Sequence, residues 1–288
     1  MYKVKFWTVK KIIAGMLLTI IGMIVGLTYD ANAAQVSAFQ IDFIDVGQGD
    51  AMLVSCDGHH MLVDGGDAAH AVVVGNYLRI RGVSHLDALV STHSHDDHLW
   101  GLSDALSVAV ADTVYSPVSA YDSDAFRSFA DKVKMQGKTI TVPKVNDTFR
   151  LGSASVRILG PYSTTMGDNN SSIILRITYG KTSFLLMGDA ESAEESALLK
   201  SGAVIKSDVL KTGHHGAEFS TEAGLLKAVA PKYAVISCGT GNMYGDPAPS
   251  VLQRLFASGV MTYRTDVNGT ITCVSDGKNV RFVSSKGF

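Results

Sequence analysis

The chain has 288 residues, of which 46% are hydrophobic and 18% are charged, and its formal net charge at pH 7 is −2. This is the composition of a globular protein whose core is large enough to need no disulfide support. No internal repeat and no low-complexity linker is visible, which excludes a repeat architecture and favours one continuous domain.

The first 33 residues have the order of a secretory signal. Four lysines precede an apolar run at residues 12–27, and Ala31-Asn32-Ala33 offers a small-x-small cleavage site. The apolar run is short for a membrane-spanning helix of about 20 residues. We therefore expect a secreted protein that begins near Ala34. The alternative is an uncleaved anchor at residues 12–27 that holds the protein to the membrane, facing outside.

Loss of this segment leaves an acidic protein. The rest of the chain has 21 basic and 26 acidic residues, a net charge of −5, because the segment takes with it Lys3, Lys5, Lys10, Lys11 and Asp30. A chain of that sign has no general electrostatic attraction for polyanions. Any binding of nucleic acid would have to come from a local patch or from metal ions.

Strand patterns come first along the remaining chain, as short apolar runs bounded by turn residues. The strands predicted in this part are 38–47, 51–56, 60–66, 86–92, 112–118 and 138–143. Helical patterns separate them at 68–83, 96–109 and 123–137, and Ser123 is a candidate N-cap of the last one.

The second part begins with a series of strands and then alternates between helices and strands. The strands are 148–152, 154–160, 171–180, 181–189, 207–213, 233–237, 261–266, 269–275 and 279–285, with a tight turn at Tyr179-Gly180-Lys181. The helices are 191–202, 221–230 and 248–259. Strand series with helices inserted between them predict two packed mixed sheets with helices outside, and functional loops at the strand ends.

The three cysteines, Cys56, Cys238 and Cys273, lie far apart and form no C-x-x-C pair. A thiolate zinc site or a disulfide framework is therefore not indicated, and we expect buried apolar thiols on strands. One disulfide with a leftover thiol is the alternative.

The segment "HSHDDH" follows the predicted strand 86–92 directly and carries the chemistry. Imidazole and carboxylate are preferred ligands of zinc and related divalent ions. His93 and His95 point the same way in an extended segment and can bind one ion together. Asp97 and His98 lie just beyond, at the start of a helix, and can reach a second ion. A solvated surface cluster is the alternative, but such a cluster would not need an apolar strand directly before it.

Two further segments supply the remaining ligands that a two-metal site needs. Asp189 ends the strand 181–189, where a carboxylate can bridge two ions. His214-His215 follows the strand 207–213, and the glycines at 213 and 216 let the backbone bend sharply around the pair. The same order thus occurs three times, with a buried strand followed by a ligand and a glycine-containing turn.

At this point the sequence resembles the metallo-β-lactamase superfamily, whose motif H-x-H-x-D-H matches "HSHDDH". From about residue 39 to 285 it looks like a narrower branch, the hydrolase domain of the ComEC competence proteins and its stand-alone relatives. The segments that carry this resemblance are "FIDVGQGDAMLV", "MLVDGG", "NNSSIILRITYG", "FLLMGDAE", "DVLKTGHHGAEFS", "NMYGDPAPSVLQRL" and "TYRTDVNGTI".

The resemblance implies an αββα four-layer sandwich as a single domain over residues 38–288. It implies two divalent ions, zinc or else manganese. His93 and His95 would hold the first ion, Asp97 and His98 the second, Asp189 would bridge them, and His214 would be the last ligand. His215 would lie behind the ligands, although the two histidines could exchange roles. Asp64 would support the ligand loop, since such residues orient imidazoles.

This chain departs from the family in places that concern the substrate. Many superfamily hydrolases have a further histidine ligand where it reads Asn169-Asn170. Asp246 stands where the ComEC branch usually has histidine, and Trp100 where a glycine is common. With Tyr244, the two asparagines and Asp246 are candidates for contacts to the substrate or leaving group, and a structural loop role is the alternative for each. The membrane channel of full-length ComEC has no counterpart here, so a transport role does not carry over.

The function that follows is hydrolysis by a hydroxide held between two ions. Asp97 or a metal-bound water would transfer the proton. Phosphodiesters come first by resemblance, either extracellular nucleic acid or a wall polymer. Hydrolysis of a lactone, thioester or β-lactam is a second hypothesis. A third is an exported binding module without catalysis, against which the six predicted ligands count. The sequence says nothing about the oligomeric state.

Overall fold

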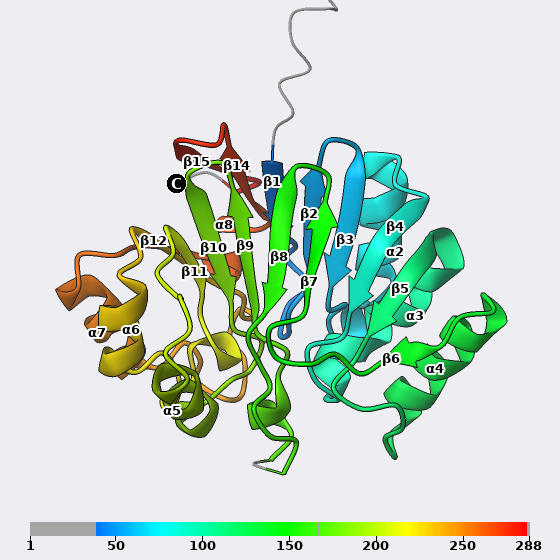
Figure 1. Ribbon diagram of the computed structural model, residues 1–288, viewed down its shortest axis with the longest axis horizontal. Coiled ribbons are helices and arrows are strands. Elements are labelled where there is room, and N and C mark those ends of the chain that lie inside the picture. The colour runs from blue at the N-terminus through cyan, green and yellow to red at the C-terminus, as the bar shows by residue number, and fades with distance from the viewer. Residues whose placement is uncertain (1–38, 166, 287–288) are drawn as a thin grey trace, which may run out of the picture. The chain divides into compact units, whose positions relative to one another are not determined.

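Two mixed β-sheets form the centre of the fold (Figure 1). The computed structural model describes residues 39–165 and 167–286. The signal or anchor segment and its cleavage site lie outside the described residues and stay predictions. Within the described part of the chain, no helix is long and apolar enough to cross a membrane.

The first sheet has eight strands in the order β15-β14-β1-β2-β3-β4-β5-β6. Its strands are β1 (Phe39–Phe43), β2 (Met52–Cys56), β3 (His59–Val63), β4 (His85–Val90), β5 (Val110–Tyr115), β6 (Ile140–Thr141), β14 (Ile271–Ser275) and β15 (Val280–Ser284). Neighbours from β15 to β3 are antiparallel, and those from β3 to β6 are parallel.

The second sheet has seven strands in the order β13-β12-β11-β10-β9-β8-β7. Its strands are β7 (Thr148–Leu151), β8 (Ala154–Ile158), β9 (Leu175–Tyr179), β10 (Thr182–Leu186), β11 (Val209–Lys211), β12 (Tyr233–Ile236) and β13 (Met261–Arg264). The strands from β10 to β13 are parallel, so their carboxyl ends, where loops carry polar side chains, lie at one edge.

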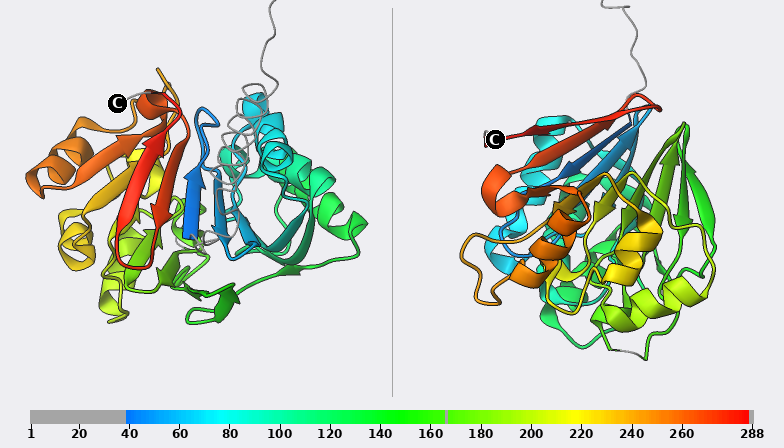
Figure 2. Two further views of the ribbon diagram at one scale, coloured as in Figure 1. Left: turned by 90° about the horizontal axis from the view of Figure 1, so that it is seen from above. Right: turned by 90° about the vertical axis from the view of Figure 1, so that its left-hand side faces the viewer.

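Helices cover the outer face of each sheet (Figure 2). The first sheet is covered by α2 (Ala71–Arg81), α3 (Asp96–Val108) and α4 (Asp124–Met135), and the second by α5 (Ser192–Lys200), α6 (Ala223–Val229) and α7 (Pro249–Ala257). A one-turn helix, α8 (Thr265–Asn268), joins β13 to β14. This confirms the predicted αββα four-layer sandwich.

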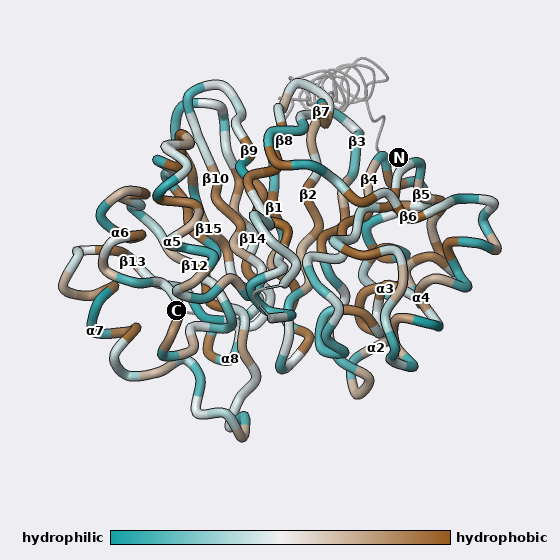
Figure 3. The backbone as a smooth tube through the Cα atoms, turned by 60° about the horizontal axis from the view of Figure 1, so that its bottom comes forward, coloured by the Kyte–Doolittle hydropathy of each residue, from teal (hydrophilic) through white to brown (hydrophobic). Residues whose placement is uncertain are grey.

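Three apolar layers hold the sandwich together, and Figure 3 shows hydrophobic residues along the strands of both sheets. The central layer lies between the sheets, where Phe39 of β1 packs on Phe184 of β10 with ring centroids 4.7 Å apart. The outer layers lie beneath the two groups of helices. Burial of each such side chain contributes about 1.5–3 kcal/mol, which is why both faces of the strands are apolar.

The local predictions mostly hold. Ser123 caps α4, since its Oγ accepts a hydrogen bond of 3.1 Å from the backbone N–H of Phe126. The turn at residues 179–181 joins β9 to β10, and all three cysteines are free and buried. The strand predicted at 138–143 is only the two-residue β6 at the edge of its sheet, followed closely by Pro143, which cannot donate to a ladder.

Candidate metal centre

The loop after β4 and the first turn of α3 carry two buried histidines to the edge of the first sheet. His93 and His98 are fully buried, whereas 39% of the side chain of His95 is exposed. The loop is fixed at its start, where the hydroxyl of Ser91 donates to the carbonyl of His93. The backbone N–H of Ile173, which precedes β9, donates to the carbonyl of Thr92. The loop is therefore tied to both sheets.

Asp64, which directly follows β3, holds this loop from behind. Its Oδ1 accepts from the N–H of Thr92 at 2.7 Å, and its Oδ2 accepts from the hydroxyl of Thr92 at 2.7 Å. Oδ2 also lies 2.9 Å from Nδ1 of His98, which leaves Nε2 of that ring free to face the site. This is the arrangement expected for a residue that orients an imidazole.

Four imidazoles converge on one carboxylate oxygen. Asp189 lies three residues beyond β10, and its Oδ2 is 3.2 Å from Nε2 of His98 and 3.4 Å from Nε2 of His215. Nε2 of His93 and of His214 are 3.7 and 3.8 Å from the same oxygen. The three sequence segments predicted to supply ligands thus meet at one point, although they are far apart along the chain.

Several atoms of this cluster are buried without a hydrogen bond. Among the described residues, Nε2 of His93, Nε2 of His98 and Oδ1 of Asp189 make none. A buried polar atom without a partner is costly, and a bound cation would supply the partner that each of these atoms lacks. The donor set of imidazole nitrogens and carboxylate oxygens suits zinc and also manganese.

One group of four ligand atoms is close enough to hold an ion. Asp97, His98, Asp189 and His215 each offer one atom, and these atoms lie within 4.8 Å of one another. A further group, Asp50 with Asp64 and His98, lies behind it. Residues of this cluster therefore fit a divalent ion, which is the group that the resemblance implies.

The two adjacent histidines lie differently in the cluster. His215, not His214, joins Asp97 and His98, and its Nε2 lies 3.2 Å from Oδ2 of Asp97. His215 is buried, and its Nδ1 lies 3.0 Å from the carbonyl oxygen of Ser237, which follows β12. His214 is partly exposed and pairs with Glu191. Of the two assignments that the sequence analysis left open, this geometry favours His215 beside Asp97 and His98.

The charges of the cluster stabilise one another. Burial alone would raise the pKa of Asp189, but the imidazoles of His215, His98 and His93 outweigh it and hold that pKa well below its usual range. Burial alone would lower the pKa of His215, but Asp189, Asp50 and Asp97 raise it to about 10. The carboxylates of Asp189, Asp50 and Asp97 thus favour positive charge in the cluster. Protons on the imidazoles or bound metal cations can supply that charge.

A buried ion pair lies behind His215, and the sequence analysis assigned it no role. Nζ of Lys211, the last residue of β11, is 2.8 Å from Oδ2 of Asp50, and both side chains are fully buried. The other oxygen of Asp50 lies 3.4 Å from Nδ1 of His215. Lys211 therefore neutralises a carboxylate that supports the candidate ligand.

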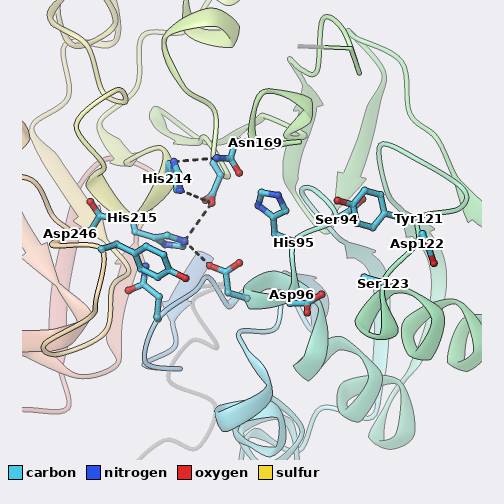
Figure 4. A pocket seen from close by; sticks show the side chains of 14 residues that line it. Ser94, His95, Asp96, Tyr121, Asp122, Ser123, Asn169, His214, His215 and Asp246 are labelled. Carbon is cyan, nitrogen blue, oxygen red and sulfur yellow. Dashed lines mark hydrogen bonds and ion pairs between the residues drawn. The ribbon is translucent and has the colours of Figure 1, made fainter. Parts of the chain in front are cut away.

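The cluster forms the floor of a cavity of about 450 Å³ (Figure 4). Asp97, Asp189, His214 and His215 line it together with His95, whose Nε2 is 3.6 Å from Oδ2 of Asp168. Its other lining residues are Gln48, Ser94, Asp96, Tyr121, Asp122, Ser123, Asn169, Tyr244 and Asp246. Trp100 lines an adjoining cavity of about 460 Å³ and also packs against the helical core.

The predicted substrate-contacting residues separate into two kinds. Asn169, Tyr244 and Asp246 line the cavity. Asn170 is nearly buried, and its Oδ1 accepts from the backbone N–H groups of Glu191 and Glu194 at the start of α5. For Asn170 the structure therefore favours the structural role over a substrate contact.

A model of the metallo-beta-lactamase superfamily matches residues 44–240. The chain belongs to this superfamily. It is 30% identical to ComE operon protein 3 of Bacillus subtilis, over 81% of this chain and 32% of that protein. It is also 30% identical to competence protein ComA of Neisseria gonorrhoeae, over 85% of this chain and 33% of that protein. These matches confirm the resemblance to the ComEC branch, and the chain spans about a third of the length of these relatives.

A solved structure supports the fold. The metallo-beta-lactamase fold protein YhfI from Bacillus subtilis has a TM-score of 0.52 to this chain and 15% sequence identity, covering 78% of this chain and 95% of that one. At this identity the likeness concerns the fold alone. With the superfamily match, it identifies the chain as a metallo-β-lactamase-fold protein of the kind that includes metal-dependent hydrolases.

Proposed function

We propose that the chain is an exported hydrolase that uses two divalent ions, zinc or manganese, to cleave phosphodiesters. The observation that carries this proposal is the convergence of four imidazole Nε2 atoms on one oxygen of Asp189 at 3.2–3.8 Å. His93 and His95 would hold the first ion, and Asp97, His98 and His215 the second, with Asp189 shared. A binding module has no need for so many candidate ligands on a cavity floor.

The bound ions would supply Lewis acidity and a nucleophile at neutral pH. The chain's own residues would orient the metal ligands and the attacking water. Asp64 and Asp50 orient His98 and His215 from behind, through contacts of 2.9 and 3.4 Å at Nδ1. Asp97 lies at the edge between the buried cluster and the cavity, where its carboxylate can accept a hydrogen bond from an attacking water and orient it. Burial alone would raise the pKa of Asp97, but His98 and His215 hold that pKa well below its usual range, so the carboxylate stays ionised.

The cavity walls favour a substrate that is anchored by metal. The residues that line the main cavity and the adjoining one include Asp67, Asp96, Asp97, Asp122 and Asp246, but no lysine or arginine among the described residues. A phosphodiester would therefore be held chiefly by the ions. Extracellular nucleic acid, which the resemblance to the ComEC branch suggests, and a wall-type phosphodiester are the substrates we propose.

The test is hydrolysis of bis(p-nitrophenyl) phosphate by the purified protein. We expect turnover with zinc or manganese that EDTA abolishes and either ion restores, and that His95→Ala removes. Turnover that survives EDTA would contradict the proposal. Nitrocefin, a thioester and a lactone run in parallel would overturn the assignment to phosphodiesters if one of them were the preferred substrate.

Asp246 is expected to assist the leaving group. It lines the cavity, and burial raises the pKa of its carboxyl group, which shifts that group toward the protonated form. Asp246→Asn should slow cleavage of a diester with glycerol leaving groups by about 100-fold or more. Cleavage of bis(p-nitrophenyl) phosphate, whose leaving group needs no proton, should fall less than about tenfold. Steady-state kinetics on the two diesters measure this, and equal losses would contradict the role.

A further inference from the structure

The adjoining cavity borders directly on the candidate metal centre. Its volume is about 460 Å³, and it shares Gln48, Asp96, Asp97 and Tyr244 with the main cavity. Asp97 is one of the four residues whose donor atoms lie close enough to hold an ion. A phosphodiester whose phosphate is held at the metal centre therefore has room to extend one of its two ester arms into the adjoining cavity.

Part of the wall of the adjoining cavity is aromatic and apolar. Trp100, in the second turn of α3, lines it and also packs against the helical core. Met243 and Tyr244 line it from the loop between β12 and α7, and 88% and 68% of their surfaces are exposed. Single exposed apolar residues are normal, but several that gather in one cavity indicate a surface that contacts a ligand.

The loop that carries Met243 and Tyr244 is held in shape by the side chain of Asn242. Its Oδ1 accepts from the backbone N–H groups of Tyr244 and Asp246, both at 3.1 Å. Its Nδ2 donates to the carbonyl of Gly239 at 3.0 Å and to that of Asp246 at 2.6 Å. The two exposed side chains thus project from a braced backbone, which lowers the cost of ordering this wall when a ligand binds.

The rest of the wall is acidic. Asp67 and Asp96 line the adjoining cavity with Asp97, and the described residues that line it include no lysine, arginine or histidine. Bound metal ions would neutralise Asp97, but Asp67 and Asp96 belong to no group of possible ligands among the described residues. The adjoining cavity therefore favours a ligand group that carries positive charge.

Anionic and uncharged ester arms fit this wall less well. A nucleic-acid strand has one negative charge per nucleotide, so a second phosphate would approach Asp67 and Asp96 with no basic residue beside it. A glycerol arm is uncharged and would make no use of the two carboxylates. An ammonium group suits both parts of the wall, because it is attracted to carboxylates and to the faces of tryptophan and tyrosine rings.

We propose that the adjoining cavity binds the ester arm of a phosphodiester whose alcohol carries an ammonium group, as in choline esters, and that Trp100, Tyr244 and Asp96 determine this specificity. In the reaction, water adds to phosphorus, one P–O ester bond breaks, and the alcohol leaves with a proton from that water. The inference rests on the proposed function, and it selects a wall-type phosphodiester with a cationic alcohol over nucleic acid.

Three p-nitrophenyl phosphodiesters test the inference with the full chain loaded with Zn²⁺. They are the choline ester, the 3,3-dimethylbutyl ester, in which carbon replaces the charged nitrogen, and the thymidine ester. Phosphorus NMR follows the consumption of each diester, because either ester bond can be the one that is cleaved. The wild type is expected to prefer the choline ester to its uncharged analogue by about 10-fold or more in kcat/KM, chiefly through a lower KM.

Variants of the wall should reduce this preference. Trp100→Leu, Tyr244→Leu and Asp96→Asn are each expected to lower it to about threefold or less, mainly by raising KM for the choline ester. Asp131→Asn, which neutralises an exposed carboxylate on α4, is the matched control and should keep the wild-type preference. Thermal unfolding shows whether each variant is folded, and the exposed positions of Tyr244 and Asp96 make loss of folding unlikely to limit the test.

Three outcomes would overturn the inference. They are equal kcat/KM values for the choline ester and its uncharged analogue, folded wall variants that all keep the wild-type preference, and a preference for the thymidine ester, which would assign the cavity to a nucleobase. Isothermal titration calorimetry with phosphocholine and 3,3-dimethylbutyl phosphate separates binding from turnover. Tighter binding of phosphocholine without hydrolysis of any diester would contradict the proposed function and leave the specificity intact, whereas equal binding would overturn the inference.

Discussion

Asp189→Asn is expected to abolish activity and to reduce the metal content from two ions to one or none. The substitution keeps the shape of the side chain but removes the charge on which four imidazoles converge. Residues that only orient ligands typically contribute about 10–100-fold to metal affinity or activity. The loss of a shared ligand should therefore exceed about 100-fold in kcat/KM for bis(p-nitrophenyl) phosphate.

A matched control is Asp131→Asn, which neutralises an exposed carboxylate on α4, far along the chain from the cluster. It should change neither the metal content nor the rate. If Asp189→Asn retained two ions and more than a tenth of the activity, Asp189 would not be the residue shared by the two ions.

Lys211→Met is expected to destabilise the fold by about 3–5 kcal/mol, because it leaves the carboxylate of Asp50 buried without its cation. The two groups lie 2.8 Å apart with no exposed surface. The free energy of unfolding in urea measures the effect. Asp50→Asn in the same chain should recover part of the loss, since it removes the unpaired charge. Because Asp50 also contacts His215, both variants should bind metal more weakly.

Lys232→Met is the control for this prediction. Nζ of Lys232 lies 3.2 Å from Oδ1 of Asp208, a pair comparable in distance, but 73% of the lysine side chain is exposed. An exposed pair contributes about 1 kcal/mol or less, so this variant should be nearly as stable as the wild type. Equal stabilities for Lys211→Met and Lys232→Met would show that the buried pair has no special role.

The sequence predicted the layers of the fold and the segments of the site because both depend on local pattern. Apolar strand runs followed by His93, Asp189 and the pair His214-His215 could be read directly, as could the helix cap at Ser123. The short β6 was overestimated, because residues 138–143 have a strand-like pattern but lie at an edge where only two residues pair.

The finer arrangement could not be predicted, because it depends on backbone angles and on contacts between distant segments. The position of His215 beside Asp97 and Asp189 follows from left-handed φ angles at His214 and His215, which the pattern H-H-G does not reveal. The pairing of Lys211 with Asp50 joins the end of β11 in the second sheet to the loop between β1 and β2 of the first. Glu191 follows Asp189 by two residues, yet its contacts with Asn169 and His214 form only once the loops of those residues lie beside it.

The most direct test of the two-metal hydrolase is the rate of bis(p-nitrophenyl) phosphate hydrolysis as a function of bound metal per chain. The protein is stripped with EDTA, titrated with Zn²⁺ or Mn²⁺, and assayed while the metal content is measured on the same samples. We expect no hydrolysis without metal and a rate that rises to a plateau at two ions per chain. Full hydrolysis in the stripped protein, or none at two bound ions, would contradict the account.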